Sequence, residues 1–154
     1  MRKGYCYETK IGVLCFVEED GQLIECTQNV TNNMFQEETD VIKYALGEVI
    51  EYLEGNLRHF KTKVKLTGTP FQQSVYHALF QVSYGTTVTY KSLAKAIGKP
   101  NSYRAVGNAL NKNPLMLFVP CHRVIKSDNT VGGFALDLEI KKTLLTLEEE
   151  NGYA

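Results

Sequence analysis

The chain has 154 residues, of which 44% are hydrophobic and 22% are charged. This composition excludes collagen-like, coiled-coil and disordered proteins and predicts an ordinary globular protein. No apolar run approaches the roughly 18 residues of a membrane-spanning helix, and no apolar segment of a secretory signal follows the basic amino terminus. We therefore expect a cytoplasmic protein without a membrane partner, whose cysteines Cys6, Cys15, Cys26 and Cys121 are free thiols.

Charge is distributed unevenly along the chain. The 17 basic and 17 acidic residues cancel, yet residues 68–127 carry seven Lys or Arg and no Asp or Glu. Residues 1–67, by contrast, carry 11 acidic and 8 basic residues. The basic segment is either an ordinary solvated surface or a face that binds a polyanion. A helix-turn-helix pattern in the same segment favours the polyanion.

The first part of the sequence predicts a small antiparallel sheet covered by a helix. Short runs rich in aromatic and β-branched residues indicate strands, and an Asp-Gly pair indicates a hairpin turn. These strands and the turn are residues 4–7, 12–17, 23–27 and Asp20-Gly21. A helix with apolar residues at helical spacing should then begin at Thr39 or Asp40 and close at Gly55. The pattern decays afterwards, so we place a domain boundary between residues 67 and 68.

The second part of the sequence predicts mainly helices. Each begins at a residue suited to the N-cap position and continues with apolar residues at helical spacing. The expected helices run from Pro70 to Val82, from Thr89 to Gly98, from Asn101 or Ser102 to Lys112, and from Asp137 through Leu147. The second and third of these, joined by a tight turn with Gly and Pro, form a helix-turn-helix. The whole chain is thus expected to be an α+β protein of two parts.

The sequence most suggestive of chemistry is Pro120-Cys121-His122-Arg123-Val124, which follows the apolar run from Leu115 to Val119. A thiol becomes a good nucleophile once it is ionised, and a neighbouring imidazole or arginine promotes ionisation. Taken alone, a Cys-His pair is more often a buried structural cysteine beside an ion-paired arginine. The surrounding sequence decides between these interpretations.

The segments 104–124, Val131-Gly132-Gly133-Phe134 and 144–148 closely resemble the O6-alkylguanine-DNA alkyltransferases, a family of DNA-repair proteins. The resemblance implies a ribonuclease H-like domain at 1–67 and a winged-helix-like, DNA-binding and alkyl-accepting domain at 68–154. It implies transfer of one alkyl group from O6-alkylguanine, and also from O4-alkylthymine, to Cys121 without turnover. It also implies a monomer that binds double-stranded DNA and uses no metal or other cofactor.

The resemblance assigns the catalytic roles residue by residue. His122 would deprotonate Cys121, in the family through a bound water, and Glu148 would orient the imidazole as in a catalytic triad. Asn113 would brace the turn around the site, and Tyr90 would donate a proton or hydrogen bond to the departing guanine. The side chains expected to line the base pocket are Leu110, Val124, Phe134 and Ala135. Judged singly, several of these residues would be assigned to the core or to a solvated surface.

The resemblance also implies that the target base leaves the duplex, because a stacked base cannot reach a protein pocket. Arg104 would fill the vacated space, with its helix in the minor groove. The small residues Ala105, Gly107 and Ala109 would let the helix approach the duplex closely. The complete set of expected DNA-contacting residues is Arg104, Ala105, Gly107, Ser102, Thr89, Lys112 and Arg123.

The sequence departs from the family pattern at Ala135-Leu136-Asp137, where many members carry Ser-Gly-Gly or a similar run of small residues. A hydroxyl contact to the guanine oxygen is therefore missing, and Leu136 should restrict large alkyl groups such as benzyl. Three other functions remain open from the residues alone: a lesion sensor without transfer, a cysteine hydrolase, and a helix-turn-helix regulator with an unreactive Cys121. A zinc site built from Cys6, Cys15, Cys26 and His59 is disfavoured by irregular spacing.

Overall fold

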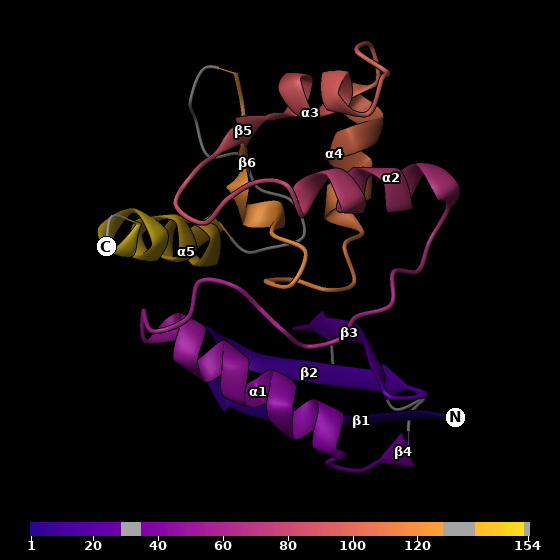
Figure 1. Cartoon of the computed structure of the whole chain (residues 1–154), viewed down its shortest axis with the longest axis vertical. Helices are drawn as coiled ribbons and strands as arrows, with labels where there is room; N and C mark the ends of the chain where they lie inside the picture. The colour runs from indigo at the N-terminus through magenta and orange to yellow at the C-terminus, as the bar shows by residue number, and fades with distance from the viewer. Residues whose placement is uncertain (29–34, 128–137, 153–154) are drawn as a thin grey trace. The chain divides into compact units, whose positions relative to one another are not determined.

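The computed structural model describes residues 1–28, 35–127 and 138–152 (Figure 1). It comprises two compact units, the first formed by residues 1–67 with 114–118 and the second by residues 68–113 with 119–154. The chain passes from the first unit to the second at residue 68. A single boundary at residue 68 does not describe the two units completely, because residues 114–118 lie after it in sequence and yet belong to the first unit. Among the described residues no helix is both long and apolar enough to cross a membrane.

The first unit is built on a sheet in the order β3-β2-β1-β4. Strands β1 (Arg2–Thr9), β2 (Gly12–Glu19) and β3 (Gln22–Thr27) are antiparallel neighbours, and the short β4 (Phe35–Gln36) adds to β1 in parallel. Asp20 and Gly21 join β2 to β3 with φ angles of 53° and 82°. Two successive positive φ angles match the hairpin turn that the Asp-Gly pair predicts.

Helix α1 (Asp40–Leu53) packs on the sheet through an apolar face that contains Ile42, Ala45 and Val49. Its N-cap is Thr39, whose hydroxyl accepts a hydrogen bond from the Ile42 amide. Strand β3 lies at one edge of the sheet. Two later segments pair with it through isolated parallel bridges, from Leu23 to Val64 and from Cys26 to Leu115. The Cys26 bridge explains why residues 114–118 belong to this unit: their backbone completes the edge of its sheet.

One prediction for the cysteines is wrong. Cys6 and Cys15 are direct partners in the β1–β2 register, with 4.0 Å between their Cα atoms, and they form a disulfide. The prediction of free thiols rested on the expected cytoplasmic location. It could not anticipate this disulfide, because the register of β1 against β2 is what brings the two thiols together. Cys26 and Cys121 are free thiols, as expected, and both are buried. With their sulfurs bonded to each other, Cys6 and Cys15 are not available as zinc ligands.

The second unit is mainly helical, as predicted. Its helices are α2 (Pro70–Leu79), α3 (Tyr90–Ala96), α4 (Tyr103–Asn111) and α5 (Leu138–Asn151). A two-stranded parallel sheet, β5 (Val88–Thr89) with β6 (Val124–Ile125), joins the start of α3 to the segment after Cys121. Helices α3 and α4 pack together as the predicted helix-turn-helix.

Two helix ends differ from their predictions. Helix α2 ends at Leu79, before the predicted end at Val82. The amides of residues 80–82 donate to carbonyls three residues back, so this turn has the hydrogen-bond spacing of a 3-10 helix and is not α-helical. Ser102 occupies the N-cap position of α4, but its hydroxyl donates to the Lys99 carbonyl and caps no amide of α4. The expected cap Asp137, like Phe134 and Ala135, lies outside the described residues.

Candidate active site

The Pro-Cys-His-Arg motif folds into a single 3-10 turn, Cys121–Arg123, directly before β6. Cys121 is 6% exposed and His122 is fully buried. The short turn sends consecutive side chains in different directions, so the thiol and the imidazole meet different neighbours. The sequence analysis identified this motif as the one most suggestive of chemistry. The structure shows that its residues are almost completely buried.

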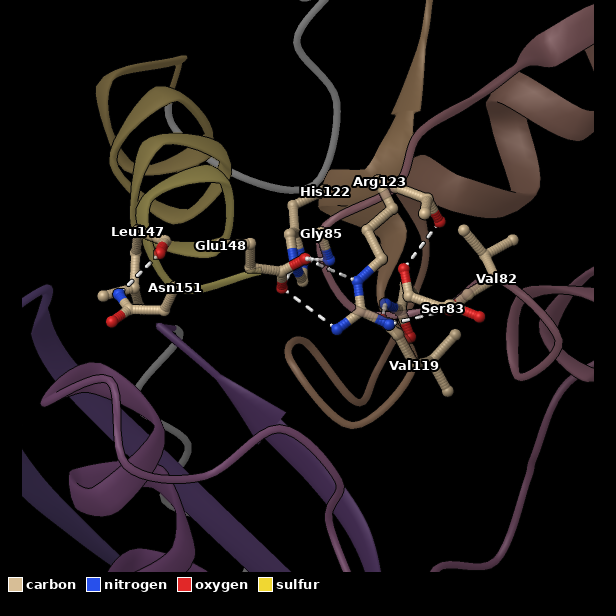
Figure 2. Close-up of polar contacts among 11 residues, drawn as sticks. Val82, Ser83, Gly85, Val119, His122, Arg123, Leu147, Glu148 and Asn151 are labelled. Atoms are coloured by element: carbon tan, nitrogen blue, oxygen red, sulfur yellow. Dashed lines mark hydrogen bonds and ion pairs between the residues drawn. The ribbon is translucent and has the colours of Figure 1, made fainter. Parts of the chain in front are cut away.

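Glu148 of α5 is the centre of a buried polar network (Figure 2). His122 Nε2 lies 2.6 Å from Glu148 Oε2, and Arg123 donates from Nε and one terminal nitrogen to the two carboxylate oxygens at 2.8 and 3.0 Å. The Gly85 amide donates to Oε1 at 3.0 Å. Glu148 is only 1% exposed. Residues from two separate parts of the chain, Gly85 and the His122–Arg123 pair, thus fix the carboxylate, and the carboxylate in turn fixes the imidazole.

The surroundings of His122 favour its neutral form. Burial lowers the pKa of this histidine below its ordinary value of 6.5, although the hydrogen bond and charge of Glu148 act in the opposite direction. Arg123 and Lys141 add positive charge nearby and lower the pKa further. At neutral pH the imidazole is therefore unprotonated, which is the state that can accept a proton.

Cys121 is held in a site where burial raises the pKa of its thiol. Three features oppose that effect by stabilising the thiolate: a hydrogen bond from the Asn113 side chain, the positive charge of Lys141, and the backbone of Cys121 itself. The Asn113 amide is oriented by donating to the Val119 carbonyl at 2.9 Å. The thiol thus needs a base to ionise, and the site supplies partners for the thiolate once it forms.

Lys141 is a component of this site that the sequence analysis did not identify. It is 3% exposed, and its Nζ donates to the Val124 carbonyl at 2.7 Å. Nζ also lies 5.9 Å from the centre of the Tyr90 ring. Lys141, Leu144 and Glu148 are the buried residues of α5. Their spacing of three and four residues was the available signal, because it places all three on one helix face.

We predict that Lys141→Met makes Cys121 less reactive and shifts its ionisation to higher pH. Burial lowers the pKa of Lys141 to about 8. Below that pH its ammonium is charged and stabilises the thiolate, so its removal should raise the apparent pKa of Cys121. The measurement is the rate of carbamidomethylation of Cys121 by iodoacetamide from pH 6 to 10, read by peptide mass. Lys142→Met, on the exposed neighbour, is the control, and equal profiles for the two variants would contradict this role.

Two tyrosines interact electrostatically with the Cys121 thiol: Tyr90, which was predicted as a site residue, and Tyr76, which was not. Tyr90, the first residue of α3, is buried, and both its burial and the charge of Cys121 raise its pKa. Tyr76 of α2 interacts electrostatically with Cys121 in the same way, and its hydroxyl donates to the Ala109 carbonyl at 2.8 Å. Leu110 and Val124 are buried in the same unit.

The predicted DNA-contacting residues divide into exposed and buried groups. Arg104, Ala105 and Lys112 are exposed on or next to α4, and Ser102 and Thr89 are partly exposed. Two expectations need correction. Gly107, like Ala109, lies on the buried face of α4, so its small size serves packing inside the unit. Arg123 is buried, and its guanidinium donates to Glu148 and to the Val82 carbonyl, so it is not available for phosphates.

Comparisons with known proteins identify one protein family. The family model of the 6-O-methylguanine DNA methyltransferase DNA-binding domain matches residues 70–150. A methylated-DNA–protein-cysteine methyltransferase of Methanosarcina barkeri is 50% identical over 107 residues, which cover 70% of this chain and 68% of that protein. The constitutive methylated-DNA–protein-cysteine methyltransferase of Bacillus subtilis is 35% identical over 151 residues, which cover 92% of each chain.

The fold points to the same group of proteins. A crystal structure of Mycobacterium tuberculosis OGT in complex with DNA matches with a TM-score of 0.91 and 30% identity, over 97% of this chain and 94% of that one. The chain belongs to the family of methylated-DNA–protein-cysteine methyltransferases, DNA-binding enzymes of DNA repair.

Proposed function

We propose that this chain repairs O6-alkylguanine in DNA, and O4-alkylthymine by the same chemistry, through irreversible transfer of the alkyl group to Cys121. The observation that carries the proposal is the buried His122–Glu148 pair, whose Nε2–Oε2 distance is 2.6 Å. His122 directly follows Cys121 in sequence. A neutral imidazole oriented by a carboxylate is a suitable base for a thiol of raised pKa. The names of the relatives support the choice of DNA as substrate.

The proposed reaction is one displacement. His122 removes the thiol proton, directly or through a water, and Nδ1 is the ring nitrogen that takes part because Nε2 faces Glu148. The Cys121 sulfur attacks the saturated carbon, a C–S bond forms, and the C–O6 bond breaks with its electron pair moving to the guanine. Tyr90 donates a proton or hydrogen bond to the departing base. The product is a thioether, a poor leaving group, so each molecule acts once.

We infer that the target base is rotated out of the duplex, at a cost of a few kcal/mol. Arg104 is the second residue of α4 and is exposed, so its side chain can fill the vacated position from the minor groove. Ala105 beside it permits a close approach, and Ser102, Thr89 and Lys112 contact the backbone. We assign these contacts to a monomer whose domain 68–154 both binds DNA and accepts the alkyl group.

We also propose a fold for each of the two domains that is more specific than the α+β class. The three antiparallel strands followed by α1 support a ribonuclease H-like arrangement for domain 1–67. The helix-turn-helix of α3 and α4, together with the small β5–β6 sheet, supports a winged-helix-like arrangement for domain 68–154.

The proposed function is tested by intact-protein mass after mixing with duplex DNA that contains O6-methylguanine. We expect one added methyl group, which saturates at one equivalent and maps to the peptide that contains Cys121. Tight binding of the lesion without added mass would instead indicate a sensor. Release of product with repeated turnover would indicate a hydrolase, and neither mass nor binding would reject DNA repair.

Arg104→Ala should slow transfer from duplex DNA roughly 10- to 100-fold, because the few kcal/mol needed to extrude a base are no longer offset. Transfer from the free base O6-methylguanine, which needs no extrusion, should change little. The measurement is the rate of Cys121 methylation from each substrate. If both rates fall equally, Arg104 acts on the chemistry or the fold and has no part in base flipping.

A further inference from the structure

A tight turn at residues 83–86, between α2 and β5, lies against the buried network of the candidate site. The Thr86 amide donates to the Ser83 carbonyl at 3.1 Å, and Gly85 between them has a φ of 78°. A hydrogen bond from the fourth residue to the first, with positive φ at the third residue, is the signature of a type II turn. That position favours glycine, so the sequence Ser-Tyr-Gly-Thr specifies the turn locally.

The turn contacts both charged partners of the network. The carbonyl of Val82, which precedes the turn, accepts from Arg123 at 2.8 Å, and the Tyr84 ring centre lies 5.7 Å from the guanidinium carbon of Arg123. The Gly85 amide donates to Glu148 Oε1 at 3.0 Å (Figure 2). A backbone amide in a tight turn cannot rotate as a side chain can. The turn therefore gives Glu148 a donor of fixed direction.

This donor influences which carboxylate oxygen faces the base. Glu148 Oε1 accepts from the Gly85 amide and from Arg123 Nε, whereas Oε2 lies 2.6 Å from His122 Nε2. With Oε1 engaged by the backbone, rotation of the carboxylate is restricted and Oε2 is directed at the imidazole. The direction of the His122–Glu148 hydrogen bond thus depends on a backbone group of a separate element.

Position 85 also has no room for a side chain. A Cβ there would lie 3.3 Å from the Gly152 Cα and 3.5 Å from the carbonyl oxygen of Glu148. Carbon atoms pack best at about 3.5–4.0 Å, so the turn and the end of α5 would have to separate. Positive φ is unfavourable for a residue with a Cβ as well. Glycine at position 85 therefore lets the turn approach α5 closely enough for its amide to reach Glu148.

We propose that Gly85 is a positioning residue for the transfer reaction, and that its turn aims the Glu148 carboxylate at His122. The inference rests on the proposed function, in which His122 is the base that takes the proton of Cys121. The effect of Gly85 on the thiol passes through Glu148 and His122, and its own contact is with the carboxylate. The turn between α2 and β5 is thereby part of the machinery that ionises Cys121.

The test deletes the amide donor alone. Glycolic acid in place of Gly85, introduced by nonsense suppression in cell-free translation, replaces the N–H with an ester oxygen in the full-length chain. The measurement is the rate of carbamidomethylation of Cys121 by iodoacetamide from pH 6 to 10. At pH 7 the rate should fall about 10-fold, the factor that corresponds to one hydrogen bond to a charged group. Near pH 10 it should approach the wild-type rate, because hydroxide then ionises the thiol without His122.

Gly21 is a matched control in the first unit. Its φ is 82°, and its amide donates to a carboxylate, Glu18 Oε2, at 2.9 Å. Glycolic acid in place of Gly21 deletes the same kind of hydrogen bond and should leave the dependence of rate on pH unchanged. Gly85→Ala and Gly21→Ala form a second pair with the same left-handed strain, and only Gly85→Ala should slow the reaction at pH 7. The ester pair keeps the test decisive if Gly85→Ala does not fold.

The imidazole N–H resonance of His122 in proton NMR reports on the same hydrogen bond without any reaction. It should move upfield with glycolic acid at position 85 and stay in place with glycolic acid at position 21. A wild-type rate at pH 7 for the position-85 ester, or an equal loss for the position-21 ester, would overturn the proposal. Iodoacetamide involves no DNA, so this result is independent of the mass experiment with O6-methylguanine, which alone decides the proposed function.

Discussion

Replacing Glu148 with Gln should both destabilise the protein and slow alkyl transfer. The carboxylate accepts hydrogen bonds from Arg123 and the Gly85 amide and faces His122 Nε2 at 2.6 Å, all within the buried network. A neutral amide leaves the buried guanidinium without its counter-charge, and breaking one partner of a buried ion pair costs about 3–5 kcal/mol. Chemical denaturation should show this loss in the free energy of unfolding.

The effect of Glu148→Gln on transfer has a separate cause. Without the carboxylate, the imidazole loses the partner that fixes its orientation and that favours its protonated form during the reaction. Methylation of Cys121 should therefore slow even at temperatures where the variant is fully folded. Glu149→Gln changes the adjacent, exposed glutamate and is the matched control. Equal stability and equal rates for the two variants would show that the buried network supports neither folding nor catalysis.

Replacing Cys121 with Ala should abolish transfer while leaving lesion binding intact. The thiol is the proposed acceptor, and its neighbours Asn113 and Lys141 stabilise the thiolate form. The smaller methyl side chain leaves the exposed residues of α4, which are proposed to contact DNA, unchanged. Intact mass after exposure to duplex O6-methylguanine should show no adduct, while anisotropy should show retained affinity for the same duplex.

Cys26 provides the control for the Cys121 substitution. It is the other free cysteine among the described residues, and it is fully buried in the first unit. Burial raises the pKa of its thiol strongly, so it should not react. Cys26→Ala should therefore still gain one methyl group. An adduct on Cys121→Ala, or its absence from Cys26→Ala folded to the wild-type extent, would contradict the assignment of the acceptor.

Local sequence patterns predicted most of the secondary structure because the signals act over a few residues. Thr69-Pro70 predicts the start of α2, and the structure shows a capping box between Thr69 and Gln72. Thr89 caps α3 in the same manner, and Asp20-Gly21 forms the predicted turn. Each of these features depends on hydrogen bonds or φ angles between near neighbours in sequence, which a short motif specifies.

Contacts between distant residues were the main source of error. The disulfide of Cys6 with Cys15 depends on the register of β1 against β2, and a shift of one residue would have directed the two side chains to opposite faces. Arg123 was among the residues expected to contact DNA. Its burial follows from Glu148, which is 25 residues further along the chain.

The sequence by itself led to the prediction of the nucleophile, the base and the carboxylate, because the motif around Cys121 and the position of Glu148 resemble one family. Only the tertiary structure decided their physical state: His122 is neutral, Cys121 is protonated at rest, and Lys141 belongs to the site. Ionisation depends on burial and on charges from separate elements. Those quantities arise when α5 packs against the Cys121 turn, and no short sequence pattern contains them.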